Sequence, residues 1–190
     1  MKKSHIFFVL ILLASFLHAK TQYAEITLKA FSSATDTKAA GKILPTTGFE
    51  VLKVVGDKAQ IKLTGWNKGE MSRILYYSKG ERIISGAFSK KAKFDLKVLG
   101  SEKIGKETWT NVTVVIWVEN KNQTDDIEAL YGKASNLLKT NCGLCHAYHP
   151  TTEFSANQWP SVIKGMIPRT PLSKEEGWLI TQFTQKHAKK

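Results

Sequence analysis

Trp109-Thr110-Asn111-Val112-Thr113-Val114-Val115-Ile116-Trp117-Val118 is the strongest β-strand candidate in this chain of 190 residues. The run is rich in β-branched and aromatic residues, which pack well on a pleated sheet. Shorter alternating runs lie upstream at residues 24–29 and 59–63, and turn residues separate them at 45–48, 56–58 and 79–81. This pattern predicts an all-β region of about seven to nine short strands.

The upstream strands also show a weak internal repeat. Residues 50–56 lead into a strand that ends at Trp66, and residues 95–100 lead into one that ends at Trp117. Such an internal repeat indicates two related small β units. The layout of residues 39–45 followed by 51–66 resembles bacterial SH3-like domains, which implies SH3-like barrel units between residues 20 and 122.

The hydrophobic period changes after residues 123–126. Apolar residues then recur at helical spacing over 127–138, and Thr124 or Asp125 suits the N-cap. A second helix is predicted from Ser173, which has capping-box spacing with Glu176. The sequence therefore predicts a two-domain α+β protein, with a basic β domain at residues 20–122 and a small all-α domain, similar to a class I cytochrome c, at 123–190.

Residues 1–19 have the pattern of a secretory signal peptide. Lys2 and Lys3 precede an apolar run over 6–17, and a cleavage site follows Ala19. The run is shorter than the roughly 20 residues that span a bilayer. An uncleaved anchor is the alternative, and no second apolar run of that length follows. We therefore expect a periplasmic protein with no transmembrane segment after signal removal.

The chain is strongly basic, with a formal net charge of +12 at pH 7. Removal of residues 1–19 leaves +10, of which +8 lies in residues 20–122 and +2 in 123–190. The excess lysine is explained either by a solvated surface or by a docking face for an acidic partner. We expect no nucleic-acid partner, because the sequence has no aromatic-interleaved basic helix and no nucleic-acid-binding motif.

Cys142-Gly143-Leu144-Cys145-His146 forms a C-x-x-C-H motif, the attachment sequence of c-type haem. Two thiols at this spacing add to the two haem vinyl groups. The adjacent His146 then becomes the proximal iron ligand. The motif predicts one covalent haem c, which uses both cysteines of the chain and leaves none for a disulfide.

Two other uses of the cysteine pair have weaker support. A thioredoxin-like dithiol requires a βαβ context, which is absent around residue 142, and a zinc site usually has a second C-x-x-C. The length of residues 123–190 also favours haem, because so small a core is marginal and a porphyrin would supply apolar surface.

The second iron ligand has four candidates in the chain after residue 19: Met166, His149, His187 and Met71. Met166 follows Lys164-Gly165, and Gly165 with Pro168 suits a loop across the distal face of the haem. His149 is three residues from the proximal ligand, and His187 suits a solvated helix end. We predict Met166 as the distal ligand, with core packing as its alternative role.

Ligation by histidine and methionine would fill the iron and leave no position for a substrate. The protein would then be an electron carrier and not an enzyme. Two alternatives remain open: a haem protein with open iron that acts as a peroxidase or gas sensor, and an SH3-like binding module that holds the haem without a redox partner.

The region 142–186 resembles one known module. The motifs that carry the resemblance are C-G-L-C-H-A-Y-H-P at 142–150, A-N-Q-W-P at 156–160, K-G-M at 164–166, R-T at 169–170 and L-S-K-E-E at 172–176. They resemble the C-terminal monohaem domain of the multihaem cytochromes that serve periplasmic trimethylamine N-oxide reductases. The whole chain is similar to small monohaem partner subunits of molybdopterin N-oxide or S-oxide reductases.

This resemblance implies that the chain delivers electrons to a periplasmic molybdopterin oxidoreductase. It implies that Cys142 and Cys145 hold the haem, that His146 and Met166 bind iron, and that Trp159 packs against the porphyrin. Core packing is the simpler role for Trp159. The multihaem relatives carry a membrane-anchored four-haem domain, whereas this sequence has a single C-x-x-C-H. We therefore expect the electron donor to be another periplasmic or membrane cytochrome.

Overall fold

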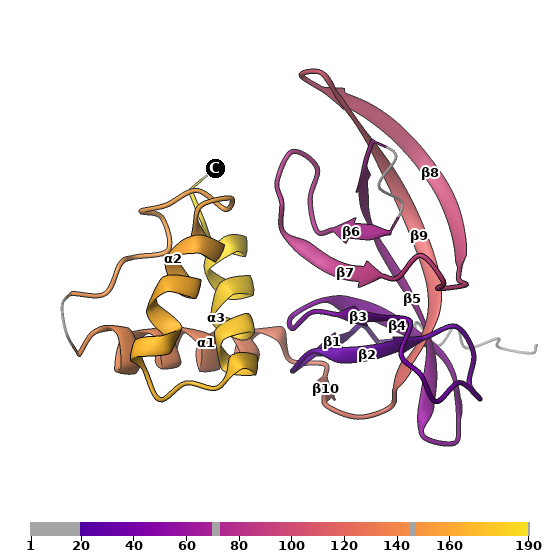
Figure 1. Cartoon of the computed structure of the whole chain (residues 1–190), viewed down its shortest axis with the longest axis horizontal. Helices are drawn as coiled ribbons and strands as arrows, with labels where there is room; N and C mark the ends of the chain where they lie inside the picture. Colours follow the sequence, from indigo (N-terminus) through magenta and orange to yellow (C-terminus); the bar gives the residue numbers. More distant parts are fainter. Residues whose placement is uncertain (1–19, 70–72, 145–146, 190) are drawn as a thin grey trace, which may run out of the picture.

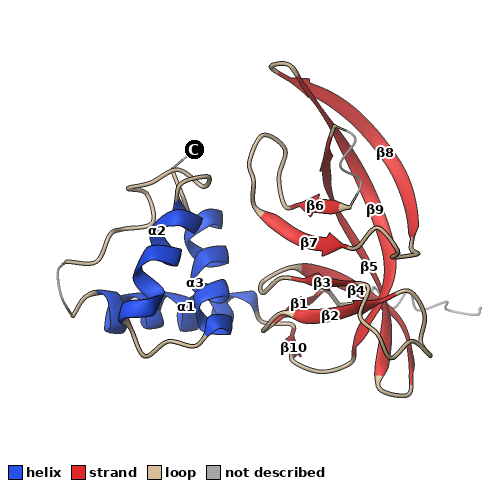
Figure 2. Ribbon diagram, viewed as in Figure 1, coloured by secondary structure: helices blue, strands red, loops and turns tan. Residues whose placement is uncertain are grey.

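A computed structural model describes residues 20–69, 73–144 and 147–189. The described residues form ten strands, three α-helices and one 3-10 turn, with the helices beside the sheet (Figure 1, Figure 2). The strands are β1 (Gln22–Ala24), β2 (Leu28–Phe31), β3 (Gly41–Ile43), β4 (Gly48–Val55), β5 (Lys58–Lys68), β6 (Ile74–Tyr76), β7 (Ile84–Phe88), β8 (Asp95–Ile104), β9 (Glu107–Glu119) and β10 (Gln123–Thr124). The helical elements are α1 (Ile127–Cys142), α2 (Trp159–Met166), the 3-10 turn η1 (Ile167–Arg169) and α3 (Lys174–Lys186).

Six of the described strands close into a barrel, in the order β5-β6-β7-β3-β2-β9, with β9 returning to β5. The antiparallel β5–β9 ladder is the longest pairing, and it runs from Lys58↔Glu119 to Lys68↔Trp109. Alternate side chains of these two strands point inward and form the barrel core, namely Ala59, Ile61, Leu63, Val112, Val114, Ile116 and Val118. The apolar run 109–118 is thus the central strand of the fold.

Four further strands extend the sheet beyond the barrel. β4, β1 and β10 continue outward from β5, and β8 continues from β9. All ten residues of β8 are exposed, and β8 with β9 forms a long curved arm (Figure 1). Close packing limits one position on β5. A Cβ on Gly65 would lie 2.6 Å from Leu75 Cγ, so glycine is required where β5 turns against β6.

The predicted architecture of SH3-like units followed by a small all-α class I-like domain is wrong. The described strands belong to one ten-stranded sheet, and the two supposed units do not separate, because β5 of the first pairs along its length with β9 of the second. Strand pairs such as Ala30↔Val118 join residues far apart in the sequence. Local alternation predicts that a strand exists, but it does not reveal which distant strand is its partner.

The helical region is not a free-standing α domain either, because α3 packs on the barrel. Its contact with the barrel includes two buried glutamines, Gln182 and Gln185, each less than 5% exposed. The Gln182 side-chain amide donates to the carbonyl of Ile84 at 3.0 Å. In the first turn of α3, Glu175 Oε2 accepts a hydrogen bond from the amide of Thr27, which precedes β2, at 2.8 Å. These hydrogen bonds satisfy polar groups that an isolated helical domain would leave to water.

Local signals fix the ends of the helices. The Asp126 carboxylate accepts from the amide of Ala129 at 2.9 Å and caps α1. Ser173 and Glu176 form the expected capping box of α3. α1 and α3 pack together through Leu130, Ala134 and Leu179. Over the described part of the chain, every helix is too short or too polar to cross a bilayer. The predicted signal peptide lies outside the described residues.

Candidate haem attachment site

Cys142 is the last residue of α1, and its side chain lies in the helical core. The residue is 8% exposed and belongs to one cluster with Leu138, Trp159, Ile163 and Ile180. Burial raises the pKa of the Cys142 thiol. Its environment is therefore apolar.

Gly143 ends α1 directly after this thiol. Its amide donates to the carbonyl of Lys139 at 3.2 Å, and a Cβ on Gly143 would lie 2.5 Å from that oxygen. Only glycine therefore fits this close approach without a shift of the backbone. The next residue, Leu144, is 78% exposed, so the chain leaves the core immediately after Cys142. The role of Gly143 was missed from the sequence, although a glycine after a periodic helix is a general helix-end signal.

The other residues of the predicted motif, Cys145 and His146, lie outside the described residues, and so does Met71. In the described ranges, His, Cys, Asp and Glu side chains do not gather in groups of three or more that would hold a metal ion. The roles of Cys145 as thioether donor and of His146 as proximal iron ligand stay predictions from the sequence.

Trp159, the first residue of α2, lies in the same cluster as Cys142 and is 1% exposed. Its indole N–H donates to the carbonyl of Thr151 at 2.9 Å. Phe154 packs edge-on against the indole, with 5.1 Å between ring centroids. The structure therefore places Trp159 in the core next to the attachment thiol, where its polar atom is satisfied by the backbone.

Met166 is the last residue of α2 and is half-buried. The sequence predicts a loop here, and the structure instead continues α2 through Gly165 and Met166 into the turn η1. A helix end fixes the backbone of Met166 more firmly than a loop would. The side chain itself is flexible and polarisable, which suits an iron ligand as well as a core position.

The two other candidate ligands both contact protein groups. His149 Nδ1 lies 2.9 Å from Glu153 Oε1. The ring of His187 packs against Tyr131 and Phe183, with 4.6 Å between centroids in each case, and its Nδ1 lies 2.8 Å from the carbonyl oxygen of Phe183. His187 is the exposed C-cap of α3, as the sequence suggested, and its ring also packs between α1 and α3.

The surroundings of Cys142 fit a porphyrin in their chemistry. The partly buried hydrophobic side chains that pack against its cluster include Leu137, Phe154, Val162, Ile167 and Leu172. An apolar cavity of ≈ 580 Å³ lies between α2, η1 and α3, and it shares Ile163 and Ile167 with this cluster. A helical core this small gains stability from added apolar surface, which a covalently held porphyrin provides.

A C-x-x-C-H sequence whose first thiol is buried in a small apolar core defines the class of c-type cytochromes. The comparison with known families agrees, since the family model described as the TorC third cytochrome c domain matches residues 17–123. The chain belongs to this TorC family. The matched residues cover all ten strands of the sheet apart from the last residue of β10 and end before α1, so the β region is the part by which the family is recognised.

Curated relatives extend the similarity across both regions. The cytochrome c-type protein TorC of Escherichia coli strain K12 is 28% identical over 156 residues, which cover 80% of this chain and 40% of the relative. The cytochrome c-type protein TorY of Haemophilus influenzae is 28% identical over 150 residues, with 78% and 41% covered. The chain therefore spans about 40% of the length of these relatives. No solved structure matches the chain.

Proposed function

We propose that this chain carries single electrons through one covalently bound c-type haem to a periplasmic molybdopterin reductase of N-oxides or S-oxides. Membership of a cytochrome c family supports the haem and the electron transfer. The resemblance of residues 142–186 to trimethylamine N-oxide reductase cytochromes supports the class of acceptor. The observation that carries the proposal is the buried Cys142 thiol at the end of α1, where the C-x-x-C-H motif begins.

In this proposal Cys142 and Cys145 would hold the haem through two thioethers, and His146 and Met166 would bind its iron. The haem, when bound, supplies one-electron oxidation and reduction. The protein contributes the apolar cluster around Cys142, which excludes water from that side of the site. If both His146 and Met166 bound the iron, no position for a substrate would be left on it, and the chain would act as a carrier and not as an enzyme.

The proposed location is the periplasm, reached through the leader at residues 1–19. The electron donor would be another periplasmic or membrane cytochrome. A periplasmic location is chemically consistent with the motif. Free thiol pairs outside the cytoplasm are normally oxidised to disulfides, whereas haem attachment would convert both thiols of this chain to thioethers.

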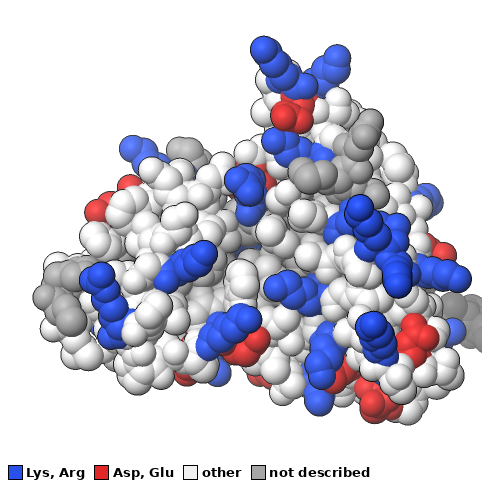
Figure 3. Space-filling view, in the orientation of Figure 1, with Lys and Arg blue, Asp and Glu red and all other residues white. Residues whose placement is uncertain are grey.

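The segment between β7 and β8 is the proposed docking surface for the acidic face of the reductase. Lys90, Lys91 and Lys93 are exposed there and form no ion pair with a described residue. The segment is held in place by Arg73, whose guanidinium donates to the carbonyls of Ser89 at 3.0 Å and Ala92 at 2.8 Å. The basic side chains thus extend from a loop that Arg73 holds. On the face of the molecule drawn in Figure 3, basic side chains are more widespread than acidic ones.

The first test is the spectrum and haem content of the purified holoprotein. We expect one haem per chain, a far-red absorption band of a methionine–ferric iron bond, and no reaction with carbon monoxide. Met166→Ala should lose the far-red band and should bind carbon monoxide. Met71→Ala is the matched control, because Met71 is the other methionine after residue 19, and it should behave as the wild type.

Two results would contradict the proposed function. A wild type that binds carbon monoxide would favour the peroxidase or gas-sensor alternative. A normal spectrum together with no oxidation of the reduced holoprotein by any N-oxide or S-oxide reductase would exclude the proposed acceptor.

A further inference from the structure

A second cavity, separate from the predicted haem site, lies where the barrel meets α1 and α3. Its volume is ≈ 460 Å³, and none of Cys142, Trp159 and Met166 lines it. The side chains that line it come from distant parts of the chain, including Tyr23 of β1, Tyr77 after β6, Tyr131 of α1 and Lys186 of α3. It is therefore formed by the packing of the helices on the barrel.

Lys186 brings an uncompensated positive group to this cavity. Its ammonium donates to both the carbonyl oxygen and Oγ1 of Thr46, at 2.8 Å each, and lies 4.4 Å from the centroid of the Tyr77 ring. No described carboxylate lies within ion-pairing distance of it. Burial lowers the pKa of Lys186 to about 7, because the charged form loses hydration that no anion replaces. An anion at this point would restore the charge balance.

The backbone that receives Lys186 is held in an unusual conformation. Thr46 lies between β3 and β4 with φ of 62°, a left-handed value that a β-branched residue rarely adopts. The residue is 1% exposed, and its amide donates to the carbonyl of Ala24 at 2.7 Å. Strain of this kind persists where the surrounding structure imposes it, and it is common at ligand sites.

Three tyrosine hydroxyl groups in the cavity wall are available to a ligand. The hydroxyl groups of Tyr23, Tyr77 and Tyr131 make no hydrogen bond to any described residue. Burial, with smaller effects of Tyr77, Glu128 and Tyr23, raises the pKa of Tyr131 to about 12, so its hydroxyl remains a donor at neutral pH. The acid that lines the cavity, Glu50, is paired with Lys62 at 2.6 Å. The charged and titratable groups near Lys186 are thus three phenols, this ion pair, Glu128 and the ring of His187 on Tyr131.

From these features we infer that the junction cavity binds a small organic acid, whose carboxylate lies among Lys186 and the three tyrosine hydroxyls. Phe49, Leu63 and Ile127 supply apolar surface to the cavity, whereas threonine and serine side chains line the rest of its wall. We therefore expect a ligand whose hydrocarbon or aromatic body lies against the apolar side chains. Tyr77 is 52% exposed, which leaves the cavity open to solvent at that side.

Calorimetric titration of the full haem-loaded chain with benzoate tests this assignment. We expect benzoate to bind at pH 6 and to bind about tenfold more weakly at pH 8, because a lysine with a pKa near 7 loses most of its charge over that interval. Lys186→Met should weaken binding at pH 6 at least tenfold and should remove the pH dependence. Lys174→Met, which alters an exposed lysine of the same helix, should bind as the wild type.

A further variant and two further ligands show whether the carboxylate itself is recognised. Tyr131→Phe removes only a hydroxyl and leaves Lys186 in place, so it should weaken benzoate binding several-fold even if Lys186→Met fails to fold. Benzyl alcohol should not bind, and inorganic phosphate should bind more weakly than benzoate. No heat with benzoate, equal binding of benzyl alcohol or phosphate, or unchanged affinity in Tyr131→Phe would each overturn the inference.

Discussion

Gly143 shows how one residue at the end of α1 controls the start of the predicted haem motif. A Cβ at this position would meet the carbonyl oxygen of Lys139 at 2.5 Å, which is backbone and has little freedom to move. We predict that Gly143→Ala lowers the free energy of unfolding of the holoprotein by about 1–3 kcal/mol, as overpacking generally does. It should also lower the yield of haem-loaded chain, because Cys142 is displaced with the helix end. Urea denaturation and haem content measure both effects.

Gly132 provides the matched control within α1. A Cβ there would meet nothing within 4 Å, so Gly132→Ala should stabilise the helix by about 0.5–1 kcal/mol. The two variants make the same chemical change in one helix, with opposite expected signs. If Gly143→Ala were as stable as the wild type, the close approach to Lys139 would not constrain the motif.

At the level of elements, α3 depends on the capping box at its N-terminus. The amide and the Oγ of Ser173 donate to Glu176 Oε2 at 2.8 Å and 2.7 Å, and Ser173 Oγ accepts from the amide of Glu176. Ser173→Ala should destabilise the protein by about 1 kcal/mol in urea denaturation. Ser161→Ala on the exposed face of α2 is the control, because its hydroxyl makes no hydrogen bond to a described residue.

The same capping box gives stability a pH dependence. Hydrogen bonds from the Ser173 amide and side chain hold the pKa of Glu176 below its ordinary value of 4.5. This contribution is therefore present above that value and is lost as the pH falls through the lower folded pKa. We expect the wild type to lose part of its stability in acid in thermal melts between about pH 5 and 3, and Glu176→Gln to lose less over that range. Parallel losses in the two proteins would contradict this role.

Prediction from sequence succeeded for elements whose signals are local. The strand at 109–118, the helix from 127 and the Ser173–Glu176 cap all rest on neighbours within a few residues, and the structure has each of them. Two small SH3-like barrel units were predicted in place of the single six-stranded barrel, because closure of that barrel depends on distant pairs such as Ala30↔Val118. The contact of α3 with the barrel was missed because polar residues such as Gln182 and Gln185 suggest a solvated face, although both are buried and donate to the carbonyls of Ile84 and Arg82. At the haem site, Cys142 is recognisable from the C-x-x-C-H motif. The residues around Lys186 form no such motif, because only the fold brings them together.

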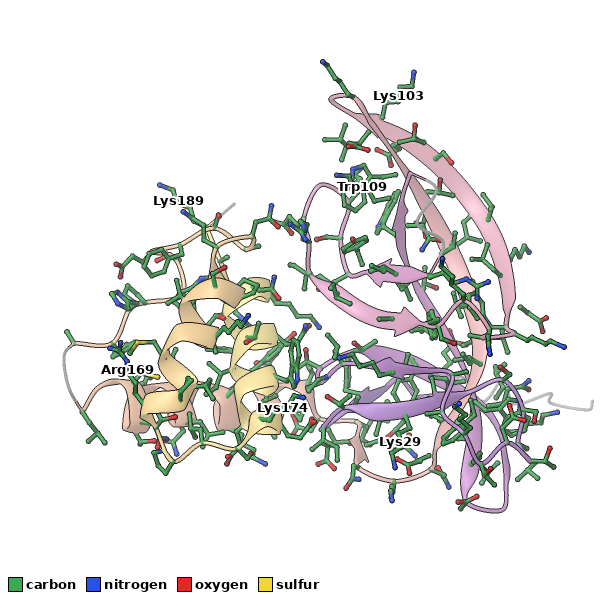
Figure 4. The ribbon with its side chains drawn as sticks, in the orientation of Figure 1. Lys29, Lys103, Trp109, Arg169, Lys174 and Lys189 are labelled. Carbon is green, nitrogen blue, oxygen red and sulfur yellow. The ribbon has the colours of Figure 1, made fainter. Side chains whose placement is uncertain are left out.

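For the whole molecule, surface charge determines how the chain meets its proposed reductase. Lys90 and Lys91 lie on the loop held by Arg73, whereas Lys103 and Lys106 lie at or beside the tip of the β8–β9 arm, far from the helices (Figure 4). We predict that the double variant Lys90→Glu/Lys91→Glu slows reduction of the reductase by the holoprotein at least about tenfold at low ionic strength. Stopped-flow oxidation of the haem by the purified reductase measures this rate.

The arm-tip variant Lys103→Glu/Lys106→Glu makes the same change in net charge and therefore separates a local contact from long-range attraction. If the loop between β7 and β8 is the docking surface, the loop variant slows transfer more than the arm variant, and the difference shrinks as salt screens exposed charges over about 10 Å at 0.1 M. Equal slowing in both variants would mean that only net charge matters. Unchanged rates and salt dependence in the loop variant would place the contact elsewhere. Strand β8 would then be the next surface to test, because its ten exposed residues include the apolar Leu96, Val98 and Leu99.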